Sequence, residues 1–239
     1  MKEKHIVSFS GGKDSTAMLL IMLEKNYKID EIVFIDTGME FPEMYDHIAK
    51  VGRMVNRKIT ILKADKSFEY MMLEHKKRNG IIGYAWPSMQ NRWCTSYLKK
   101  DVVRRYLRQY QKQGFTIVEY HGIAADESDR ANKNKEKNVK YPLIELGITE
   151  KQALEYCYSR GLTWKGLYKQ FKRVSCWCCT LQRISELKAL YKWHPRLWNK
   201  LKKMDKKSWN KFRLDYTLEQ LEERFKKEIW IEEHQLCMF

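Results

Sequence analysis

A glycine turn between an apolar run and an apolar helix-like segment constrains this fold most. The turn is Ser10-Gly11-Gly12-Lys13-Asp14-Ser15, after Ile6-Val7-Ser8-Phe9 and before residues 16–23. Glycines let backbone N–H groups approach an anion closely, and the positive end of the following helix points to the same place. Lys13 adds a positive charge, and Ser10 and Ser15 add hydroxyl donors. The turn predicts a phosphate-binding loop with Ser10, Gly11, Gly12, Lys13 and Ser15 around the anion.

The loop differs from the two commonest phosphate-binding motifs. It contains neither the GxxxxGK(S/T) pattern of Walker A loops nor the GxGxxG pattern of dinucleotide-binding folds. A tight turn that merely requires glycine would explain Gly11 and Gly12. It would not explain six ordered residues of this kind at a strand-to-helix junction.

Apolar runs and helix-like segments alternate along the first half of the chain. Strands are predicted at residues 5–9, 32–36, 58–62 and 115–121, and helices at 15–26, 43–55, 68–78 and 95–112. This alternation predicts a three-layer, Rossmann-like α/β fold with a parallel sheet and ligands at the carboxyl ends of its strands. The loops at 10–15, 36–42 and 122–130 would meet at that edge.

The second half of the pattern is helical. Lys133 to Lys140 is polar and rich in lysine, which predicts a mobile loop. Thr149 with Gln152 and Thr217 with Gln220 have the spacing of capping boxes. We expect a nucleotide-binding α/β domain over residues 1–145 and a helical, basic, cysteine-containing extension over 146–239, packed on it.

Four segments together resemble the phosphoadenosine phosphosulfate (PAPS) reductase family of the PP-loop adenine nucleotide alpha-hydrolase superfamily. They are the SGGKDS loop, the DTGMEFPE segment over 36–43, the RWCT segment that leads to Lys99, and the segment from Gly122 to Arg130. They occur in the family order. The last segment departs from the family pattern: Ala124 stands where arginine is usual, and Arg130 comes one residue early.

The resemblance implies an adenine nucleotide as ligand. PP-loop enzymes typically cleave ATP between the α- and β-phosphates, so pyrophosphate would lie on the loop, with Lys13 and Asp14 as catalytic residues beside Cys94. Mg²⁺ would bridge the phosphates, held by Asp14 or Asp36. The expected nucleotide contacts outside the loop are Asp36, Thr37, Gly38, Arg92 and Arg130. Helix capping for either acid and surface ion pairs for either arginine are the alternatives.

The cysteines give a second group of candidate residues. Cys176 and Cys179 form a CxxC pair able to hold a soft metal, and Cys94 lies eighty-two positions earlier. The layout is similar to that of assimilatory adenylylsulfate reductases, which implies a 4Fe–4S cluster on Cys94, Cys176 and Cys179. The fourth ligand is left open between Cys178, Cys157 and none. A zinc clasp and reduced core thiols are the alternatives.

The chain lacks one feature of PAPS reductases, the catalytic ECGLH or ECGIH segment near the C-terminus. Cys237, with His234 close by, has the wrong order and spacing for such a nucleophile. We therefore expect sulfur insertion rather than sulfonucleotide reduction.

The formal net charge of +16 favours acidic partners. Residues 188–213 hold ten Lys or Arg and one acid, with Trp193, Trp198, Trp209 and Phe212 among them. Aromatic residues between cations can stack on bases, or they can form the buried stripe of amphipathic helices. No apolar run of about 18 residues occurs and the N-terminus does not resemble a signal peptide, so we expect no membrane association and a cytoplasmic location.

These observations lead to three functional hypotheses. The first is an ATP pyrophosphatase that adenylates an acceptor for sulfur transfer to nucleic acid, of the DNA phosphorothioation or tRNA thiolation type, with a cysteine desulfurase as sulfur donor. The second is a PAPS or adenylylsulfate reductase that releases sulfite. The third is a nucleic-acid-binding module that keeps a nucleotide as a structural ligand.

Overall fold

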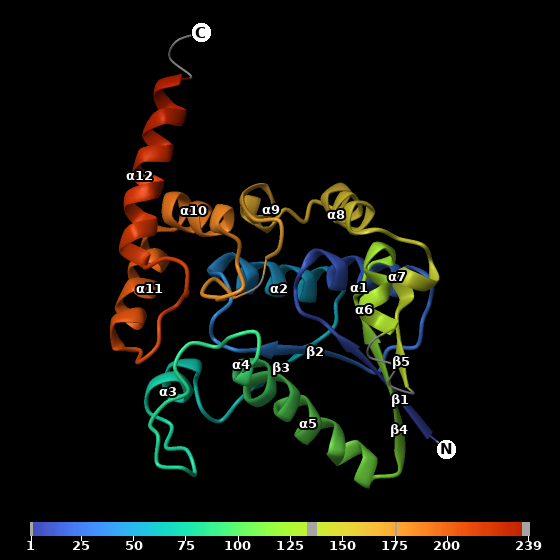
Figure 1. Cartoon of the computed structure of the whole chain (residues 1–239). Helices are drawn as coiled ribbons and strands as arrows, with labels where there is room; N and C mark the ends of the chain where they lie inside the picture. The colour runs from blue at the N-terminus through green and yellow to red at the C-terminus, as the bar shows by residue number, and fades with distance from the viewer. Residues whose placement is uncertain (1, 133–137, 175, 236–239) are drawn as a thin grey trace.

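The centre of the molecule is a five-stranded parallel sheet in the order β3-β2-β1-β4-β5 (Figure 1). The computed structural model describes residues 2–132, 138–174 and 176–235. The strands are β1 (Lys2–Ser8), β2 (Glu31–Asp36), β3 (Ile59–Lys63), β4 (Phe115–His121) and β5 (Val139–Lys140). The predicted parallel α/β architecture is confirmed, and the carboxyl ends of β1, β2 and β4 meet at one edge.

Helices cover both faces of this sheet, as the three-layer prediction requires. On one face lies α5 (Asp101–Lys112), whose Leu107 joins Ile6, Val33 and Ile117 in a small apolar cluster (Figure 1). The opposite face carries α1 (Lys13–Glu24) and α2 (Pro42–Met54). The connections hold the shorter elements α3 (Phe68–Leu73), α4 (Trp93–Thr95), η1 (Ser96–Lys100), η2 (Ala125–Glu127), α6 (Ser128–Asn132) and α7 (Pro142–Glu145).

The C-terminal part is helical and consists of α8 (Glu150–Ser159), η3 (Trp164–Gly166), α9 (Leu167–Gln170), α10 (Ile184–Trp193), α11 (Pro195–Lys207) and α12 (Leu218–Gln235). Of these, α8, α9 and α10 lie over α1 and α2 as a further layer, and α11 and α12 stand at one end of the molecule (Figure 1). Thr149 and Gln152 form the predicted capping box before α8, and Thr217 and Gln220 bond reciprocally before α12. Among the described residues, no helix combines the length and apolarity that crossing a bilayer requires.

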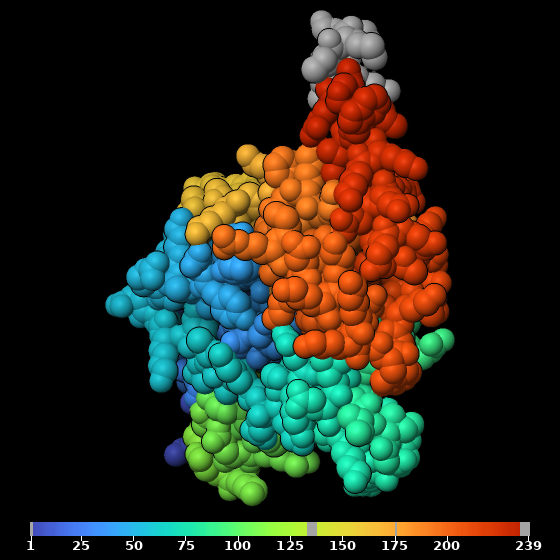
Figure 2. Space-filling model, turned by 90° about the vertical axis from the view of Figure 1, so that its left-hand side faces the viewer, coloured from blue at the N-terminus to red at the C-terminus, as the bar shows by residue number. Residues whose placement is uncertain are grey.

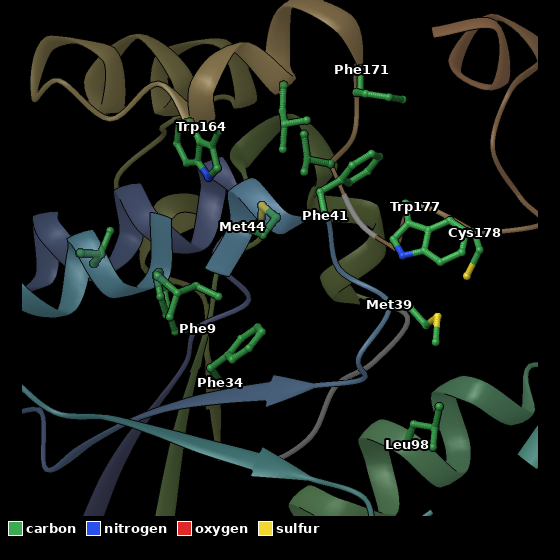
Figure 3. Packing of buried hydrophobic residues seen from close by; sticks show 14 of the residues in the cluster. Phe9, Phe34, Met39, Phe41, Met44, Leu98, Trp164, Phe171, Trp177 and Cys178 are labelled. Carbon is green, nitrogen blue, oxygen red and sulfur yellow. The ribbon is translucent and has the colours of Figure 1, made fainter. Parts of the chain in front are cut away.

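One hydrophobic core joins the N-terminal and C-terminal parts. Helix α1 is buried from Thr16 through Met22, because the sheet covers one side and α8 packs on another. A helix enclosed in this way has to be apolar all round, as its sequence is. Figure 3 shows the shared core, in which the rings of Phe41 and Phe171 lie 4.9 Å apart between their centroids.

Two local predictions are corrected. The helix predicted at 68–78 ends at Leu73, and the chain then forms a loop in which Lys76 bridges to Ile82. The predicted mobile loop at 133–140 is wrong at its end, because Val139 and Lys140 pair with β4 as strand β5. Residues 133–137 lie outside the described residues.

Candidate functional site

The glycine loop has the strand–turn–helix form that its sequence predicts. Lys13 is the first residue of α1, and Gly12 is its N-cap and has no side chain to cap the helix amides. Gly11 has a φ of +77°, and a Cβ there would lie 3.0 Å from Ile48 Cγ1. Ser10 and Ser15 face each other with 3.0 Å between their hydroxyl oxygens. The turn thus requires glycine and presents two hydroxyls.

A cavity of about 320 Å³ opens at this loop. Ser10, Gly12, Lys13, Asp14, Ser15 and Arg130 all line it, together with Glu40, Lys99, Glu127, Glu150 and Tyr168. Gly122, which follows β4, also lines it and closes against α1. A Cβ on Gly122 would lie 2.7 Å from the backbone N and Cα of Ser15, so only glycine fits between the two segments.

Lys13 is a buried cation held by two carboxylates. Its Nζ lies 2.9 Å from Glu150 Oε1 and 3.1 Å from Asp14 Oδ2, and the residue is 8% exposed. Burial lowers the pKa of Lys13, but the hydrogen bonds and charges of Glu150 and Asp14 outweigh it and raise the pKa above its ordinary value. Lys13 therefore stays positively charged in the cavity.

Asp14 has one oxygen without a partner. Asp14 Oδ2 accepts from Lys13, whereas Oδ1 is buried and has no hydrogen-bond partner among the described residues. Burial raises the pKa of Asp14, and the charge of Lys13 opposes part of that rise. A carboxylate oxygen of this kind beside a phosphate loop suits a hard cation such as Mg²⁺. Asp14 thus fits the predicted magnesium contact.

Residues of the C-terminal part form hydrogen bonds with the backbone of the glycine loop. The Trp164 indole donates from Nε1 to Gly11 O at 2.8 Å, and Cys157 Sγ donates to Lys13 O at 3.5 Å. Figure 3 shows Trp164 reaching from the C-terminal layer toward the N-terminal helices. The Tyr168 hydroxyl accepts the backbone N–H of Lys13 at 2.7 Å. Cys157 therefore contacts the glycine loop. It is not among the cysteines that line a second, neighbouring cavity, which are Cys94, Cys176, Cys178 and Cys179.

Asp36 ends β2, and Thr37 and Gly38 begin the loop after it. None of the three lines the nucleotide cavity, and Thr37 lines a neighbouring one. Asp36 accepts from Gly38 N and Tyr45 Oη, each at 2.8 Å, and pairs with Lys63. Burial raises the pKa of Asp36, but these partners lower it below its ordinary value. The carboxylate of Asp36 therefore bonds to Gly38, Tyr45 and Lys63. The predicted Mg²⁺ contact would need one of its oxygens to face the nucleotide cavity, which Asp36 does not line.

Four cysteines gather in a neighbouring cavity of about 170 Å³. Cys94, Cys176, Cys178 and Cys179 all line it, as do Thr37, Arg92, Lys99, Arg173 and Gln182. The cysteine segment lies against the loop after β2, where Trp177 N donates to Met39 O at 3.0 Å (Figure 3). Arg92 thus lies at the cysteine cavity rather than at the phosphate loop.

Burial favours the protonated form of Cys94, Cys176 and Cys178. It raises the pKa of Cys94, raises that of Cys176 to about 11 although Lys99 partly opposes the rise, and raises that of Cys178 well above its ordinary value. None of the five described cysteines forms a disulfide.

The thiols suit soft metals, but they are not arranged as a closed site for one ion. Within residues 2–132, 138–174 and 176–235, no three His, Cys, Asp or Glu side chains form a group that could hold a metal ion. Zinc needs a compact tetrahedral set with Zn–S distances of about 2.3 Å. A four-iron cluster is a larger body and needs thiols spread around a cavity, as the four cysteines are here. The four cysteines around one cavity are thus a donor set of the type that a cluster would need.

The two cavities adjoin. Lys99, Arg173 and Cys176 line both, so one thiol and two cations lie between the phosphate loop and the remaining cysteines. Lys99 could be expected, because it belongs to the family segment that begins with RWCT. No sequence pattern indicated Arg173, Tyr168 or Glu150. These three come from the helical layer and reach the site only through tertiary packing.

The basic tract at 188–213 is divided between the core and the surface. Trp198 and Phe212 are buried, whereas Trp193 and Trp209 are exposed. Five of its ten cations form ion pairs: Lys188, Lys192, Lys200, Lys202 and Arg213. The interpretation as a buried stripe is therefore confirmed for Trp198 and Phe212, whereas base stacking stays a prediction for Trp193 and Trp209. Cys237 lies outside the described residues.

Comparison with solved structures gives a distant match. The structure of PAPS reductase from Candida auris has 17% sequence identity and a TM-score of 0.48, covering 73% of this chain and 81% of that one.

Comparison with known sequences identifies the family of this chain. An uncharacterized protein of Methanocaldococcus jannaschii is 27% identical over 208 residues, covering 84% of this chain and 41% of that protein. The chain spans less than half the length of that relative and of a second one from the same organism. Adenosine 5'-phosphosulfate reductase of Geobacillus kaustophilus is 31% identical over 176 residues, 68% of each chain. The family model for the phosphoadenosine phosphosulfate reductase domain matches residues 4–182, from the first strand through the cysteine segment. With most of its length matched, the chain belongs to the phosphoadenosine phosphosulfate reductase family.

Proposed function

We propose that this chain is an ATP pyrophosphatase that activates an acceptor for sulfur transfer to nucleic acid. The observation that carries the proposal is the adjacency of the phosphate-loop cavity and the four-thiol cavity, which share Cys176. An activation site beside a set of thiols suits an enzyme that first makes a leaving group and then replaces it with sulfur.

The phosphate loop would stabilise the departing pyrophosphate. In the proposed reaction an acceptor oxygen attacks the α-phosphorus of ATP, the bond to the β-phosphate oxygen breaks, and pyrophosphate leaves. The amide of Gly12, the hydroxyl of Ser15 and the ammonium of Lys13 supply donors where the negative charge develops. Asp14 Oδ1 would hold Mg²⁺, which neutralises phosphate charge when bound.

The thiol cavity would supply the sulfur. A cysteine desulfurase would load one of its cysteines as a persulfide, whose outer sulfur would replace the activated oxygen while AMP leaves. A second thiol of the cavity would then attack the sulfur–sulfur bond, release the thiolated acceptor and form a disulfide with the first cysteine, which an external thiol reductant would reopen. Cys94, Cys176, Cys178 and Cys179 would carry that sulfur or hold a 4Fe–4S cluster, which supplies an iron to which sulfide binds. Lys99 and Arg173 face both cavities and would hold the nucleotide phosphate during the exchange. We place this activity in the cytoplasm, where thiols stay reduced.

Pyrophosphate release tests the proposal. Protein purified without oxygen is incubated with ATP and Mg²⁺, once with water as the only acceptor and once with added RNA and DNA, and pyrophosphate and AMP are quantified. We expect release to fall at least about a hundredfold in Lys13→Ala, as for loss of an electrostatic stabiliser. The matched control is Lys25→Ala, at an exposed lysine just after α1, which should keep full activity. ATP that stays intact under all these conditions would remove the pyrophosphatase proposal.

A second candidate function is reduction of adenylylsulfate or PAPS. It is favoured by the likeness to the adenosine 5'-phosphosulfate reductase of Geobacillus kaustophilus, which matches over 68% of each chain. It lacks support from the sequence, since no ECGLH or ECGIH segment occurs. Sulfite release from either sulfonucleotide in the presence of thioredoxin, without pyrophosphate release from ATP, would establish this second function instead.

A further inference from the structure

The solvent face of α11 and the loop after it form a cationic surface. Its exposed members are Arg196, Lys203, Lys206, Lys207 and Lys211. None of them forms an ion pair with any residue that the structure describes, whereas the other five cations of this tract do. The apolar residues Trp198, Leu201 and Met204 occupy the opposite, buried face of the helix. The cations thus line the outer face of a packed helix without an ion-pair partner among the described residues.

An exposed indole lies at the end of this surface. Trp209 follows α11 and is 65% exposed. The ammonium of Lys77 lies 5.6 Å from its ring centroid and 5.0 Å from that of Tyr84, so the loop after α3 adds its cation to the same surface. The ring is held beside Lys211 and Lys77 but is not covered, as a platform for a stacked base would be.

The surface is joined to the rim of the four-thiol cavity. Asn210 accepts from Trp86 N at 2.8 Å and donates to Trp86 O at 3.1 Å, and the next two residues, Pro87 and Ser88, line that cavity. Figure 2 shows the orange surface of the α10–α11 region bordering the teal and green surface of residues 70–90. A polymer lying on α11 would therefore reach the thiols without leaving the protein.

We infer that this surface binds an unpaired loop of a folded RNA and presents it to the thiol cavity. The cations meet the phosphates, and Trp209 stacks on a base. Stacking requires a base that is not already stacked in a duplex, and folded RNA presents such bases in stable loops, whereas most DNA is paired. The inference rests on the proposed sulfur transfer and specifies its acceptor.

Binding is tested on the full chain by fluorescence anisotropy without ATP. The probes are an RNA hairpin with an unpaired loop, a blunt RNA duplex of the same stem, a DNA hairpin of the same sequence and a duplex DNA. We expect the RNA hairpin to bind best. Trp209→Ala should weaken that binding on the order of tenfold. The Lys203→Gln/Lys207→Gln double variant should reduce the slope of log K against log salt by about 1.4.

Matched controls are Trp230→Ala, at another exposed indole, and Lys25→Gln/Lys112→Gln, with two exposed lysines after α1 and at the end of α5. Neither should change binding. Equal binding of blunt duplex RNA or of either DNA, or an unchanged Trp209→Ala, would overturn the inference. Pyrophosphate release is measured on the same preparations without RNA: release without hairpin binding would reject this surface and leave the proposed function standing.

Discussion

The hydroxyl of Tyr168 accepts the backbone N–H of Lys13 at 2.7 Å, where α1 begins. That N–H belongs to the first helical residue, so no carbonyl within the helix can accept it. A phosphate bound to the loop would accept a hydrogen bond from the same amide. Tyr168 also lines the nucleotide cavity, so its phenol oxygen stands where a phosphate oxygen is expected.

Tyr168→Phe should therefore make the free protein less stable and its response to pyrophosphate larger. The change leaves the Lys13 N–H unpaired in the free protein, at a cost of about 1–3 kcal/mol. Pyrophosphate then supplies the missing acceptor without having to displace a hydroxyl. Thermal melts with and without pyrophosphate check this, with Tyr158→Phe as the control. A smaller pyrophosphate-induced shift than in the wild type would mean that Tyr168 helps to hold the anion.

Glu150→Gln should strengthen pyrophosphate binding several-fold. Glu150 pairs with Lys13 Nζ at 2.9 Å and lines the cavity, so its negative charge both neutralises Lys13 and repels an incoming anion. Two unit charges about 4 Å apart interact by about 1 kcal/mol in water and by more in a protein. Isothermal titration measures the affinity. Glu155→Gln, on the same helix but paired with Lys151, is the control and should bind like the wild type.

Gly122→Ala should destabilise the fold by about 1–3 kcal/mol, as overpacking does. The added Cβ would lie 2.7 Å from the backbone N and Cα of Ser15, which cannot swing away as a long side chain can. Gly52→Ala is a control of opposite sign. It lies inside α2 with its nearest neighbour at 3.4 Å, so alanine there should stabilise the helix. Denaturant unfolding compares the two, and equal stability of both variants would refute the close packing at Gly122.

Glu222 should make the packing of α12 on α11 sensitive to acid. Glu222 Oε2 accepts from Lys202 Nζ at 2.5 Å and from Trp198 Nε1 at 3.1 Å. The hydrogen bond from Lys202 is the main reason that the pKa of Glu222 falls to about 2 in the folded chain. Because folding favours the ionised form, the stabilisation is complete above the ordinary pKa of about 4.5 and is lost as the pH falls toward 2.

Glu222→Gln should thus cost about 1–3 kcal/mol of unfolding free energy at pH 7 and progressively less below pH 4. Melting curves at several pH values measure this difference. The exposed neighbour Glu223 gives the control, Glu223→Gln, which should leave the curve unchanged. A penalty for Glu222→Gln that is the same at pH 3 and pH 7 would show that packing rather than charge is responsible.

The features that could be predicted from the sequence are those that depend on residues close together along the chain. The loop at 10–15 could be recognised because its glycines, hydroxyls and lysine act within one turn, and the strands because buried parallel strands are continuous apolar runs. Gathering of Cys94 with Cys176 was expected from a family resemblance rather than from spacing. Tyr168, Trp164 and Glu150 escaped prediction, because an aromatic or acid in an amphipathic helix has the same local pattern whether or not it reaches the site. Asp36 was drawn away from the cavity by Lys63 and Tyr45, partners that no local pattern indicates.

The contact between residues 13 and 168 has a consequence for how the protein is made. The two residues are 155 positions apart, so the phosphate loop emerges from the ribosome long before the hydroxyl that completes it. At about 5–20 residues per second, that interval is roughly eight to thirty seconds. During this time the outer side of α1 also lacks its cover, because α8 has yet to be made. The nascent first half of the chain therefore exposes an apolar helix, and its ability to bind a nucleotide should mature only after residue 168 has been made.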